Sequence, residues 1–375
     1  MKIRAAVLNA MGAQPPYDKS KPLAVDTIEL DAPGRGEVLI RIAAAGLCHS
    51  DLSVINGDRP RPTPMLLGHE AAGVVEACGE GVDDLREDDH VVLVFIPSCG
   101  HCLPCSEGRP ALCVNGAVAN TAGTLMGGHR RLFRGGERIN HHMGCSAFAE
   151  RAVVSRNSVV KIDRDVPLEH AALFGCAVLT GVGTVVNTAR VPMGATVAIV
   201  GLGGVGLAAV LGAVAAGASR IVAVDISKEK LDFAKTIGAT DTFDATAPDA
   251  VDAIRAATDG GLEYALEFAG SVKAMELAYK VTRRGGTTVT AGLPHPSATF
   301  AIPHTHLVAE ERTVKGSYIG TCVPTRDLPR FVALYKQGRL PVDKLLTHRL
   351  KLEEINEGFE RLREGKAIRQ VVIPA

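Results

Sequence analysis

Four cysteines crowd into one short stretch of the chain, at Cys99, Cys102, Cys105 and Cys113. Four thiolates can complete a tetrahedron around Zn²⁺ and leave no ligand position open, which is the arrangement of structural zinc sites. Bacterial iron–sulfur runs instead place three residues before their last cysteine and a proline after it. Here seven residues precede Cys113 and Val114 follows it. We therefore predict a structural zinc lobe over residues 99–113, with four free thiols as the alternative.

A second set of possible metal ligands is spread along the chain, at Cys48, His69 and Cys176. Taken singly, each cysteine could be a small buried hydrophobe, and the histidine could be an ordinary core residue. Their contexts favour a shared site, because Cys48 follows an expected strand, His69 precedes one and Cys176 lies just before the nucleotide-binding half. Two cysteines and one histidine, with a fourth position open, are typical of a catalytic zinc.

The run Gly201-Leu-Gly203-Gly-Val-Gly206 matches G-x-G-x-x-G and lies between an expected strand and an expected helix. In a dinucleotide-binding turn, the first glycine permits the tight bend, the second lets the backbone approach a pyrophosphate, and the third lets the helix pack on the sheet. Asp225 ends the next strand, 19 residues after Gly206. A carboxylate there binds ribose hydroxyls and repels a 2′-phosphate, which favours NAD over NADP. A structural turn and a solvated strand-end carboxylate are the alternatives.

The composition limits the classes of partner. The 375 residues suggest two domains, and the 41 basic and 41 acidic residues balance. Proteins that bind nucleic acid or anionic membranes usually have a basic excess, so we expect neither partner. We expect a cytoplasmic globular protein, because the N-terminus has no signal-peptide hydrophobic region and no apolar run reaches the roughly 20 residues that span a bilayer.

The elements that must position these residues fall into two patterns. The first part has short β-branched runs at residues 37–43, 71–76 and 90–95, and the Gly-rich stretch 116–136 is expected to be a surface loop. From about residue 178, strands alternate with helices, which predicts parallel βαβ units and an α/β fold class. The expected strands are 196–200, 220–224, 264–268, 287–291 and 368–373. One expected helix follows the glycine turn and ends near residue 216. Three more are expected over residues 228–237, 328–337 and 352–364.

Taken together, these motifs resemble the zinc-containing alcohol dehydrogenases of the medium-chain dehydrogenase/reductase family. The resemblance runs through Gly46-Leu-Cys48-His-Ser-Asp51, Gly68-His69-Glu70, the four-cysteine run, Gly175-Cys176-Ala-Val-Leu-Thr180-Gly, the glycine turn, Ile355–Phe359 and Ala367-Ile-Arg369. It implies a GroES-like β-rich catalytic domain over residues 1–178 and 320–375, and a Rossmann NAD-binding domain over 179–319. It also implies an active site in the cleft between them, and a homodimer formed through the Rossmann sheets or a homotetramer.

The resemblance assigns roles at the catalytic centre. Cys48, His69 and Cys176 would hold a catalytic zinc, in addition to the structural zinc of the lobe. Glu70 matches a carboxylate that approaches the metal during ligand exchange, and Asp51 matches the carboxylate that orients the zinc-bound histidine. Ser50 matches the hydroxyl that receives the substrate proton. The implied reaction is hydride transfer between a primary or secondary alcohol and NAD, which gives an aldehyde or ketone.

The resemblance also assigns residues to the cofactor and to the substrate. Thr180 and Val205 match nicotinamide contacts, His49 and Arg369 match pyrophosphate contacts, and Asp225 and Lys230 match contacts on the adenosine side. The glycine turn contributes Gly201, Gly203, Gly204 and Gly206. A mostly apolar substrate pocket would include Phe95, Phe148, Leu293 and Tyr318.

Some positions depart from the family pattern. Ser53 stands where many members end the proton relay on a histidine, which leaves the proton exit open. Arg61 and Ala117 replace an acidic residue and an arginine of the glutathione-dependent formaldehyde dehydrogenases, which argues against glutathione adducts. Arg59 and Arg61 could recognise a substrate carboxylate or could be solvated loop residues. A polyol dehydrogenase of the same family, a zinc-free NADPH reductase and a non-catalytic zinc-binding module are the remaining alternatives.

Overall fold

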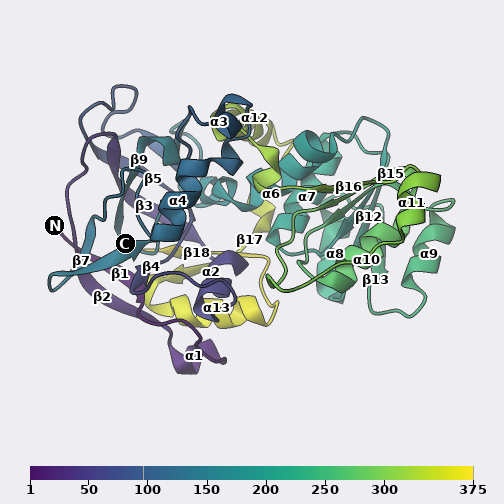
Figure 1. Cartoon of the computed structure of the whole chain (residues 1–375), viewed down its shortest axis with the longest axis horizontal. Helices are drawn as coiled ribbons and strands as arrows, with labels where there is room; N and C mark the ends of the chain where they lie inside the picture. The colour runs from purple at the N-terminus through teal and green to yellow at the C-terminus, as the bar shows by residue number, and fades with distance from the viewer. Residues whose placement is uncertain (96, 375) are drawn as a thin grey trace. The chain divides into compact units, whose positions relative to one another are not determined.

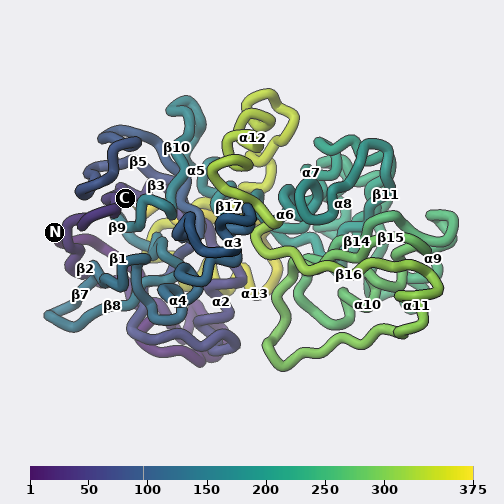
Figure 2. Tube along the Cα trace, turned by 45° about the horizontal axis from the view of Figure 1, so that its top comes forward, coloured from purple at the N-terminus to yellow at the C-terminus, as the bar shows by residue number. Residues whose placement is uncertain are grey.

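The computed structural model describes residues 1–95 and 97–374, and the chain divides into two compact units (Figure 1, Figure 2). The first unit consists of Met1–Cys176, Val323–Ala333 and Leu346–Ala375. The second consists of Ala177–Cys322 and Leu334–Leu345.

Two β-structures form the framework of the first unit. Five strands close into a small barrel in the order β1-β2-β7-β8-β4. Seven strands form a sheet in the order β10-β6-β5-β3-β18-β17, with β9 also paired to β3. The barrel strands are Lys2–Leu8 (β1), Leu23–Leu30 (β2), Met65–Leu66 (β4), Leu132–Arg134 (β7) and Glu137–His141 (β8). The sheet strands are Glu37–Gly46 (β3), Glu70–Cys78 (β5), His90–Val94 (β6), Arg151–Ser155 (β9), Val159–Ile162 (β10), Leu346–Lys351 (β17) and Arg369–Ile373 (β18).

The pairing of β3 with its neighbours brings distant segments together. β5 runs antiparallel to β3, and Ala45 near the end of β3 lies opposite Ala71 near the start of β5. β18 is also antiparallel to β3 and pairs Val371 with Gly46. The apolar β3 is buried along nearly its whole length, as expected for a strand that is covered on both faces. One edge of the sheet therefore gathers the residues that follow β3 and those that begin β5 and β18.

Short helices connect these strands. Those of the first unit are Tyr17–Ser20 (α1), His49–Ile55 (α2), Leu103–Ser106 (α3), Val114–Ala122 (α4), Leu168–Ala172 (α5) and Ile355–Arg363 (α13), and Pro324–Lys336 (α12) belongs partly to each unit. The amphipathic α13 buries Ile355, Phe359 and Leu362 on one face, which is the spacing expected of a helix that covers a core.

The Gly-rich stretch 116–136 is not the surface loop predicted from its composition. Most of α4 and all of β7 lie within it. The Cys113 sulfur accepts a hydrogen bond from the Gly116 N–H at the start of α4, and Gly123 ends the helix in a left-handed conformation with φ 67°. Glycine supplies that terminal bend without a Cβ clash. Gly116 and Gly123 therefore help to start and end a helix of small residues.

The second unit is built on a parallel sheet of six strands in the order β13-β12-β11-β14-β15-β16 (Figure 1). This is the Rossmann strand order, which reverses between β11 and β14, and it confirms the predicted α/β class. The strands are Thr196–Val200 (β11), Arg220–Asp225 (β12), Asp241–Asp244 (β13), Leu262–Glu267 (β14), Thr282–Thr290 (β15) and Thr313–Gly316 (β16). The helices are Ala177–Gly183 (α6), Gly204–Ala215 (α7), Lys228–Thr236 (α8), Ala250–Ala257 (α9), Val272–Val281 (α10) and His304–Ala309 (α11).

The glycine turn between β11 and α7 has the geometry that its sequence predicts. Gly201 has a φ of +92° and lies against the Ala269 backbone. A Cβ at Gly206 would come within 1.8 Å of the Gly201 carbonyl oxygen, so the helix begins in direct contact with the turn. A Cβ at Gly203, by contrast, would meet nothing within 4 Å. Two of these glycines are therefore required by packing, whereas Gly203 leaves open space in front of the backbone.

The unit boundaries differ from the expected ones around α12. Residues 334–345 were expected in the first domain with the rest of the C-terminal segment, but Leu334–Leu345 packs with the second unit. Leu340 and Val342 are buried, and Gly338, Arg339 and Pro341 line one pocket together with Leu211 and Val214 of α7. Apolar side chains after α12 draw this segment onto α7, which the helix pattern of the sequence did not reveal.

No single helix among residues 1–95 and 97–374 is both long and apolar enough to cross a membrane. One bent pair of consecutive helices, Leu168–Gly175 with Ala177–Ala189, passes by length and composition alone.

The glycine geometry predicts opposite outcomes for two alanine substitutions. Gly206→Ala forces its methyl group onto the Gly201 carbonyl and should destabilise the protein by about 1–3 kcal/mol, as overpacking does. Gly203→Ala meets no atom and should leave stability close to that of the wild type. Thermal unfolding followed by circular dichroism measures both. Equal midpoints for the two variants would contradict the close contact between α7 and the turn.

Candidate active site

Three potential metal ligands from distant segments meet in the first unit. The Cys48 and Cys176 sulfurs and a His69 ring nitrogen lie within 4.8 Å of one another, and all three residues are buried. His69 Nε2 has no hydrogen-bond partner among the described residues although it is shielded from solvent. A buried polar atom without a partner is unfavourable, and a metal ion at this point would satisfy it. Two thiols and an imidazole form a donor set that suits zinc.

The local backbone explains how these ligands converge. Cys48 follows β3 and is the N-cap residue of α2, His69 immediately precedes β5, and Cys176 lies between the turn Leu173–Gly175 and α6. Gly68 has a φ of +94°, and a Cβ there would lie 2.6 Å from the Phe148 backbone nitrogen. Only glycine fits this approach, which lets the backbone present His69 to the interior.

The buried Asp51 carboxylate orients His69. Asp51 Oδ1 lies 3.0 Å from His69 Nδ1 and accepts a hydrogen bond from the Gly68 N–H at 3.2 Å. Because a carboxylate only accepts, Nδ1 carries the proton and the Nε2 lone pair is left for the site formed with the two cysteines. This is the carboxylate–histidine pairing that fixes the tautomer of a metal-bound histidine.

The charges of this cluster reinforce one another. Burial opposes the charged forms of both Asp51 and His69, but the Asp51 carboxylate raises the pKa of His69 to about 10, and His69 holds the pKa of Asp51 below its usual range. Hydrogen bonding from Cys176 holds the pKa of the Cys48 thiol well below its usual range, although burial alone would raise it. The positive charge of His69 lowers this pKa further. The thiolate is the form that binds metal, and a metal ion at His69 Nε2 would bind the imidazole that carries its one proton on Nδ1.

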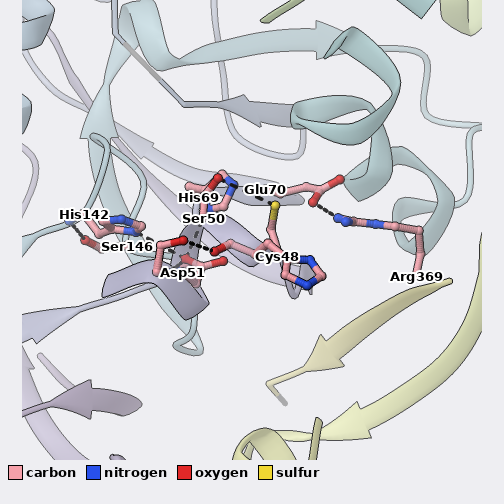
Figure 3. Close-up of polar contacts among 11 residues, drawn as sticks. Cys48, Ser50, Asp51, His69, Glu70, His142, Ser146 and Arg369 are labelled. Atoms are coloured by element: carbon pink, nitrogen blue, oxygen red, sulfur yellow. Dashed lines mark hydrogen bonds and ion pairs between the residues drawn. The ribbon is translucent and has the colours of Figure 1, made fainter. Parts of the chain in front are cut away.

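Glu70 and Arg369 form a second buried ion pair beside these ligands (Figure 3). Glu70 begins β5 and Arg369 begins β18, the strands on either side of β3. Gly46 makes room for the pair, since a Cβ there would lie 2.8 Å from Glu70 Oε2 and 3.0 Å from Arg369 Nη2. Arg369, which the sequence assigned to the cofactor pyrophosphate, is therefore partnered here by Glu70, the carboxylate expected to approach the metal.

The start of α2 carries the predicted proton acceptor. The Ser50 hydroxyl lies 3.9 Å from the Cys48 sulfur and is half-buried. The Ser53 hydroxyl donates to the His49 carbonyl one turn earlier, at 2.8 Å. His49, assigned to the pyrophosphate, is exposed. Ser53 therefore satisfies the helix backbone and is not a free end of a proton relay.

The four residues assigned to the substrate pocket lie in different surroundings. Phe95 packs edge-on against the His69 ring, with centroids 5.2 Å apart, and so lies beside the metal-ligand group. Phe148 is instead a core residue with no exposed surface, edge-on to Phe359 at 5.9 Å, and its side chain is not available to a substrate. Leu293 and Tyr318 belong to the second unit, where both are exposed.

His142 was missed by the sequence analysis. It is fully buried, its Nδ1 lies 3.3 Å from Asp51 Oδ1, and its ring is edge-on to that of His69 (Figure 3). It belongs to no motif, so spacing gave no reason to select it. The one available signal was the adjacent pair His141-His142, because two neighbouring histidines require partners if they are buried.

The four lobe cysteines form a compact group of their own. Their sulfurs lie within 4.8 Å of one another, with Cys102 Sγ 3.5 Å from that of Cys105 and 3.9 Å from that of Cys113. Backbone N–H groups point at the sulfurs, including Cys102 N–H to Cys99 and Gly116 N–H to Cys113. Hydrogen bonding from the His101 backbone lowers the pKa of Cys99 to about 6. A closed set of four sulfurs surrounded by N–H donors fits a structural zinc.

Several residues assigned to the dinucleotide lie in the second unit, whereas His49 and Arg369 belong to the first. Asp225 Oδ2 accepts from the Leu202 N–H at 2.6 Å and Oδ1 from the Ser227 N–H at 2.9 Å, so the carboxylate ties the glycine turn to the end of β12. Gly204 and Val205 open α7, and Lys230 lies in the first turn of α8. Thr180 lies in α6, which approaches α7 so closely that a Cβ at Gly181 would be 2.3 Å from the Val205 carbonyl oxygen.

The two cysteine groups predict different consequences of losing one thiol. Cys102→Ser opens the closed lobe site, which contributes folding free energy. A loss of only about 2 kcal/mol would lower the thermal midpoint by roughly 4–8 °C. Cys176→Ser should lose one bound zinc with a smaller change in the midpoint. Zinc content and thermal unfolding of the two variants test this. A Cys102→Ser protein with full zinc content and an unchanged midpoint would contradict the structural assignment.

Comparison with known proteins agrees with this geometry. Residues 34–164 match the family model of the alcohol dehydrogenase GroES-like domain, and residues 204–337 match that of a zinc-binding dehydrogenase. The chain is 41% identical to "Putative alcohol dehydrogenase D" of Mycobacterium tuberculosis over the full length of both. An alcohol dehydrogenase zinc-binding domain protein from Burkholderia ambifaria has 35% identity and a TM-score of 0.94, with both chains fully covered.

A benzyl alcohol dehydrogenase from Acinetobacter calcoaceticus has 33% identity and a TM-score of 0.93, again with both chains fully covered. The first unit thus contains the GroES-like domain and the second unit the Rossmann sheet, as the sequence implied. This likeness extends over the whole chain. The chain belongs to the zinc-binding alcohol dehydrogenases of the medium-chain dehydrogenase/reductase family.

Proposed function

We propose that this oxidoreductase is a zinc-dependent alcohol dehydrogenase that uses NAD and interconverts primary or secondary alcohols with aldehydes or ketones. The observation that carries the proposal is the convergence of Cys48, His69 and Cys176, with the His69 Nε2 lone pair buried and unpartnered among the described residues. Three protein ligands leave a fourth position of a tetrahedral metal for a substrate, unlike the closed lobe site.

The donor set fits a resident metal. Zn²⁺ held by these three residues would act as a Lewis acid that lowers the pKa of a bound hydroxyl. The chain's own contribution is to hold the ligands in their binding forms. Asp51 keeps the proton on His69 Nδ1, and the neighbours of Cys48 favour its thiolate. The second pair, Glu70 with Arg369, keeps another buried carboxylate charge-balanced next to the ligands.

Ser50 is the hydroxyl best placed to take the substrate proton. It is the second residue of α2, two residues after the ligand Cys48 and half-exposed. An alcohol that loses a hydride to the cofactor must also lose its hydroxyl proton. Ser50 Oγ can accept that proton while passing its own to solvent water, because Ser50 is partly exposed. Phe95 beside His69 provides an apolar wall for the carbon part of the substrate.

The glycine turn and Asp225 support NAD as the hydride acceptor. The open space before Gly203 admits a pyrophosphate to the start of α7, whose N–H groups favour an anion. Asp225 already accepts two backbone hydrogen bonds, yet each carboxylate oxygen has a further lone pair for a ribose hydroxyl. A 2′-phosphate would face this carboxylate at close range, which is unfavourable.

Substrate identity follows from a screen for NADH production. The similarity to a benzyl alcohol dehydrogenase makes aromatic primary alcohols the first set, followed by aliphatic primary and secondary alcohols, polyols and ω-hydroxy acids. Activity confined to polyols would favour the polyol dehydrogenase alternative, and a preference for hydroxy acids would favour recognition by Arg59 and Arg61. No NADH or NADPH formation with any class by the zinc-loaded protein would contradict the proposed function. We also propose a homodimer, because of the similarity to the family. The molecular mass of the protein in solution tests this proposal.

Replacing Asp225 should change cofactor preference. The wild type should prefer NAD over NADP by roughly 100-fold or more in kcat/KM, since like charges placed together cost several kcal/mol. Asp225→Gly should narrow this ratio by relieving the repulsion and by removing the ribose contact. Asp232→Gly, an exposed acidic position on α8, is the matched control and should keep the ratio. A wild type with equal kcat/KM for both cofactors would refute the role of Asp225.

Replacing Ser50 should slow turnover without loss of metal. Ser50→Ala should lower kcat by about 10²–10⁴-fold, the usual contribution of a positioned proton acceptor. Ser53→Ala, which removes a hydroxyl already bonded to the His49 carbonyl, should have a much smaller effect. Steady-state rates over a range of pH, with zinc content measured in parallel, give the comparison. A Ser50→Ala enzyme that matches the wild type at every pH would exclude Ser50 from the proton path.

A further inference from the structure

His142 is a second buried histidine beside the metal-ligand group, and the reaction as proposed does not use it. Its side chain is wholly shielded from solvent, and its ring stands edge-on to that of His69 with centroids 5.7 Å apart. Neither ring nitrogen completes a hydrogen bond to another described residue. Buried polar groups in native proteins nearly always have partners, and an exception requires an explanation.

Asp51 is the group that His142 faces (Figure 3). His142 Nδ1 lies 3.3 Å from Asp51 Oδ1, the oxygen that already receives the Gly68 N–H and His69 Nδ1. Because the carboxylate only accepts, the nitrogen that faces it carries the proton. Asp51 Oδ2 is buried without a hydrogen-bond partner among the described residues. Asp51 Oδ1 therefore holds two hydrogen bonds, from Gly68 and His69, with the His142 ring nitrogen at ion-pair distance beside them, and Oδ2 stays unused.

The turn that carries His142 is strained and firmly bonded. Met143 and Ser146 have positive φ values of 50° and 51°, which side chains with a Cβ seldom adopt. The His142 N–H donates to Ser146 Oγ at 2.9 Å, and the His142 carbonyl accepts from the Cys145 and Ser146 N–H groups. Strain of this kind persists only where the surroundings fix it, and it is concentrated at functional sites. The turn therefore holds the imidazole against Asp51.

We propose that His142 is a positioning residue for the metal ligand His69 and acts through Asp51, an inference that rests on the proposed function. Gly68 donates to Oδ1, and His142 Nδ1 lies 3.3 Å from the same oxygen, so a rotation that presented Oδ2 to His69 would break the first contact and separate the second pair. His69 Nδ1 thus stays on one fixed oxygen, and its Nε2 lone pair stays aimed at the sulfurs of Cys48 and Cys176. Partners of this kind typically contribute about 10–100-fold to metal affinity.

The same atoms do not form a metal site of their own. Ligand atoms of Asp51, His69 and His142 lie within 4.8 Å of one another, which is close enough for one ion. His69, however, offers a single lone pair, on Nε2, because Nδ1 carries the proton that faces Asp51. That lone pair belongs to the group with the two cysteines. Asp51 and His142 alone supply too few ligands for a stable zinc site.

Paired substitutions separate hydrogen bonding from packing. His142→Phe keeps the ring volume and removes the donor, whereas His142→Asn keeps an N–H group near the position of Nδ1 and loses ring volume. Ser146→Ala loosens the turn without changing the ring. It replaces His142→Phe as the test variant if His142→Phe does not fold. His141→Phe is the matched control, because this neighbouring buried histidine accepts from the Arg131 N–H and does not face Asp51.

The readout is retention of the catalytic metal by the full-length protein. Each variant is loaded with zinc and exposed to a chelator, and zinc loss from the two sites is followed over time. Cobalt-loaded samples give visible absorption bands that differ between a two-cysteine, one-histidine site and a four-thiolate site, so the two sites are distinguished. We expect His142→Phe to hold the catalytic metal about 10-fold or more less tightly, with altered cobalt bands. His142→Asn and His141→Phe should stay close to the wild type, and Ser146→Ala should weaken the site less than His142→Phe.

Equal metal retention and equal cobalt bands in His142→Phe and the wild type would overturn the inference. So would loss of metal in both His142 variants alike, because packing and not the N–H group would then be responsible. A third metal per chain in the wild type would also overturn it, in favour of a site at Asp51. A wild type that binds zinc in the lobe alone would overturn the proposed function itself, and the positioning role with it.

Discussion

The antiparallel pairing of β3 with β5 is the constraint on which the candidate site depends. Cys48 lies two residues beyond the end of β3, and His69 lies one residue before the start of β5. The pairing of Ala45 with Ala71 places these two ends side by side. A slip of one residue would turn every side chain of the strand to the opposite face. The burial of β3 along nearly its whole length opposes such a slip, so packing of the sheet fixes the metal-ligand geometry.

Buried charge at this edge of the sheet is arranged in compensated pairs. Asp51 faces His69, and Glu70 faces Arg369. An isolated charge in such a position would be strongly unfavourable, whereas a paired and hydrogen-bonded one is tolerated. The ligands can therefore be held in a dry interior in the protonation states that metal binding requires. Removing one member of either pair would leave its partner as an uncompensated buried charge, which is destabilising. The stability of this region and its metal-binding chemistry therefore depend on the same residues.

Sequence reasoning identified the parts of the site that depend on local spacing. The four lobe cysteines, the glycine turn and the segments around Cys48, His69 and Cys176 all lie within runs whose geometry is set by nearby residues, and the structure brings each group together. The Rossmann order of the second unit also followed from the alternation of strands and helices. These features are determined by local backbone requirements and by the regular spacing of apolar residues along the sequence.

The remainder depends on tertiary contacts that no local pattern encodes. His142 becomes relevant only because a turn after β8 brings its ring to Asp51, about ninety positions away in the chain. Phe148 was assigned to the pocket, yet the fold places it against Phe359 in the core. Residues 116–136 contain a helix whose start is bonded to the Cys113 sulfur. Each of these outcomes reflects a partner that is distant in sequence or a bond specific to this fold.

Alcohol oxidation should require the metal at Cys48, His69 and Cys176, and not the metal of the lobe. Partial removal of zinc by a chelator, followed by stepwise restoration, tests it most directly when NADH formation and the zinc content of each site are measured in the same samples. We expect the rate of NADH formation to rise in proportion to occupancy of the two-cysteine, one-histidine site while the lobe stays filled. Full NADH formation with that site empty would contradict it.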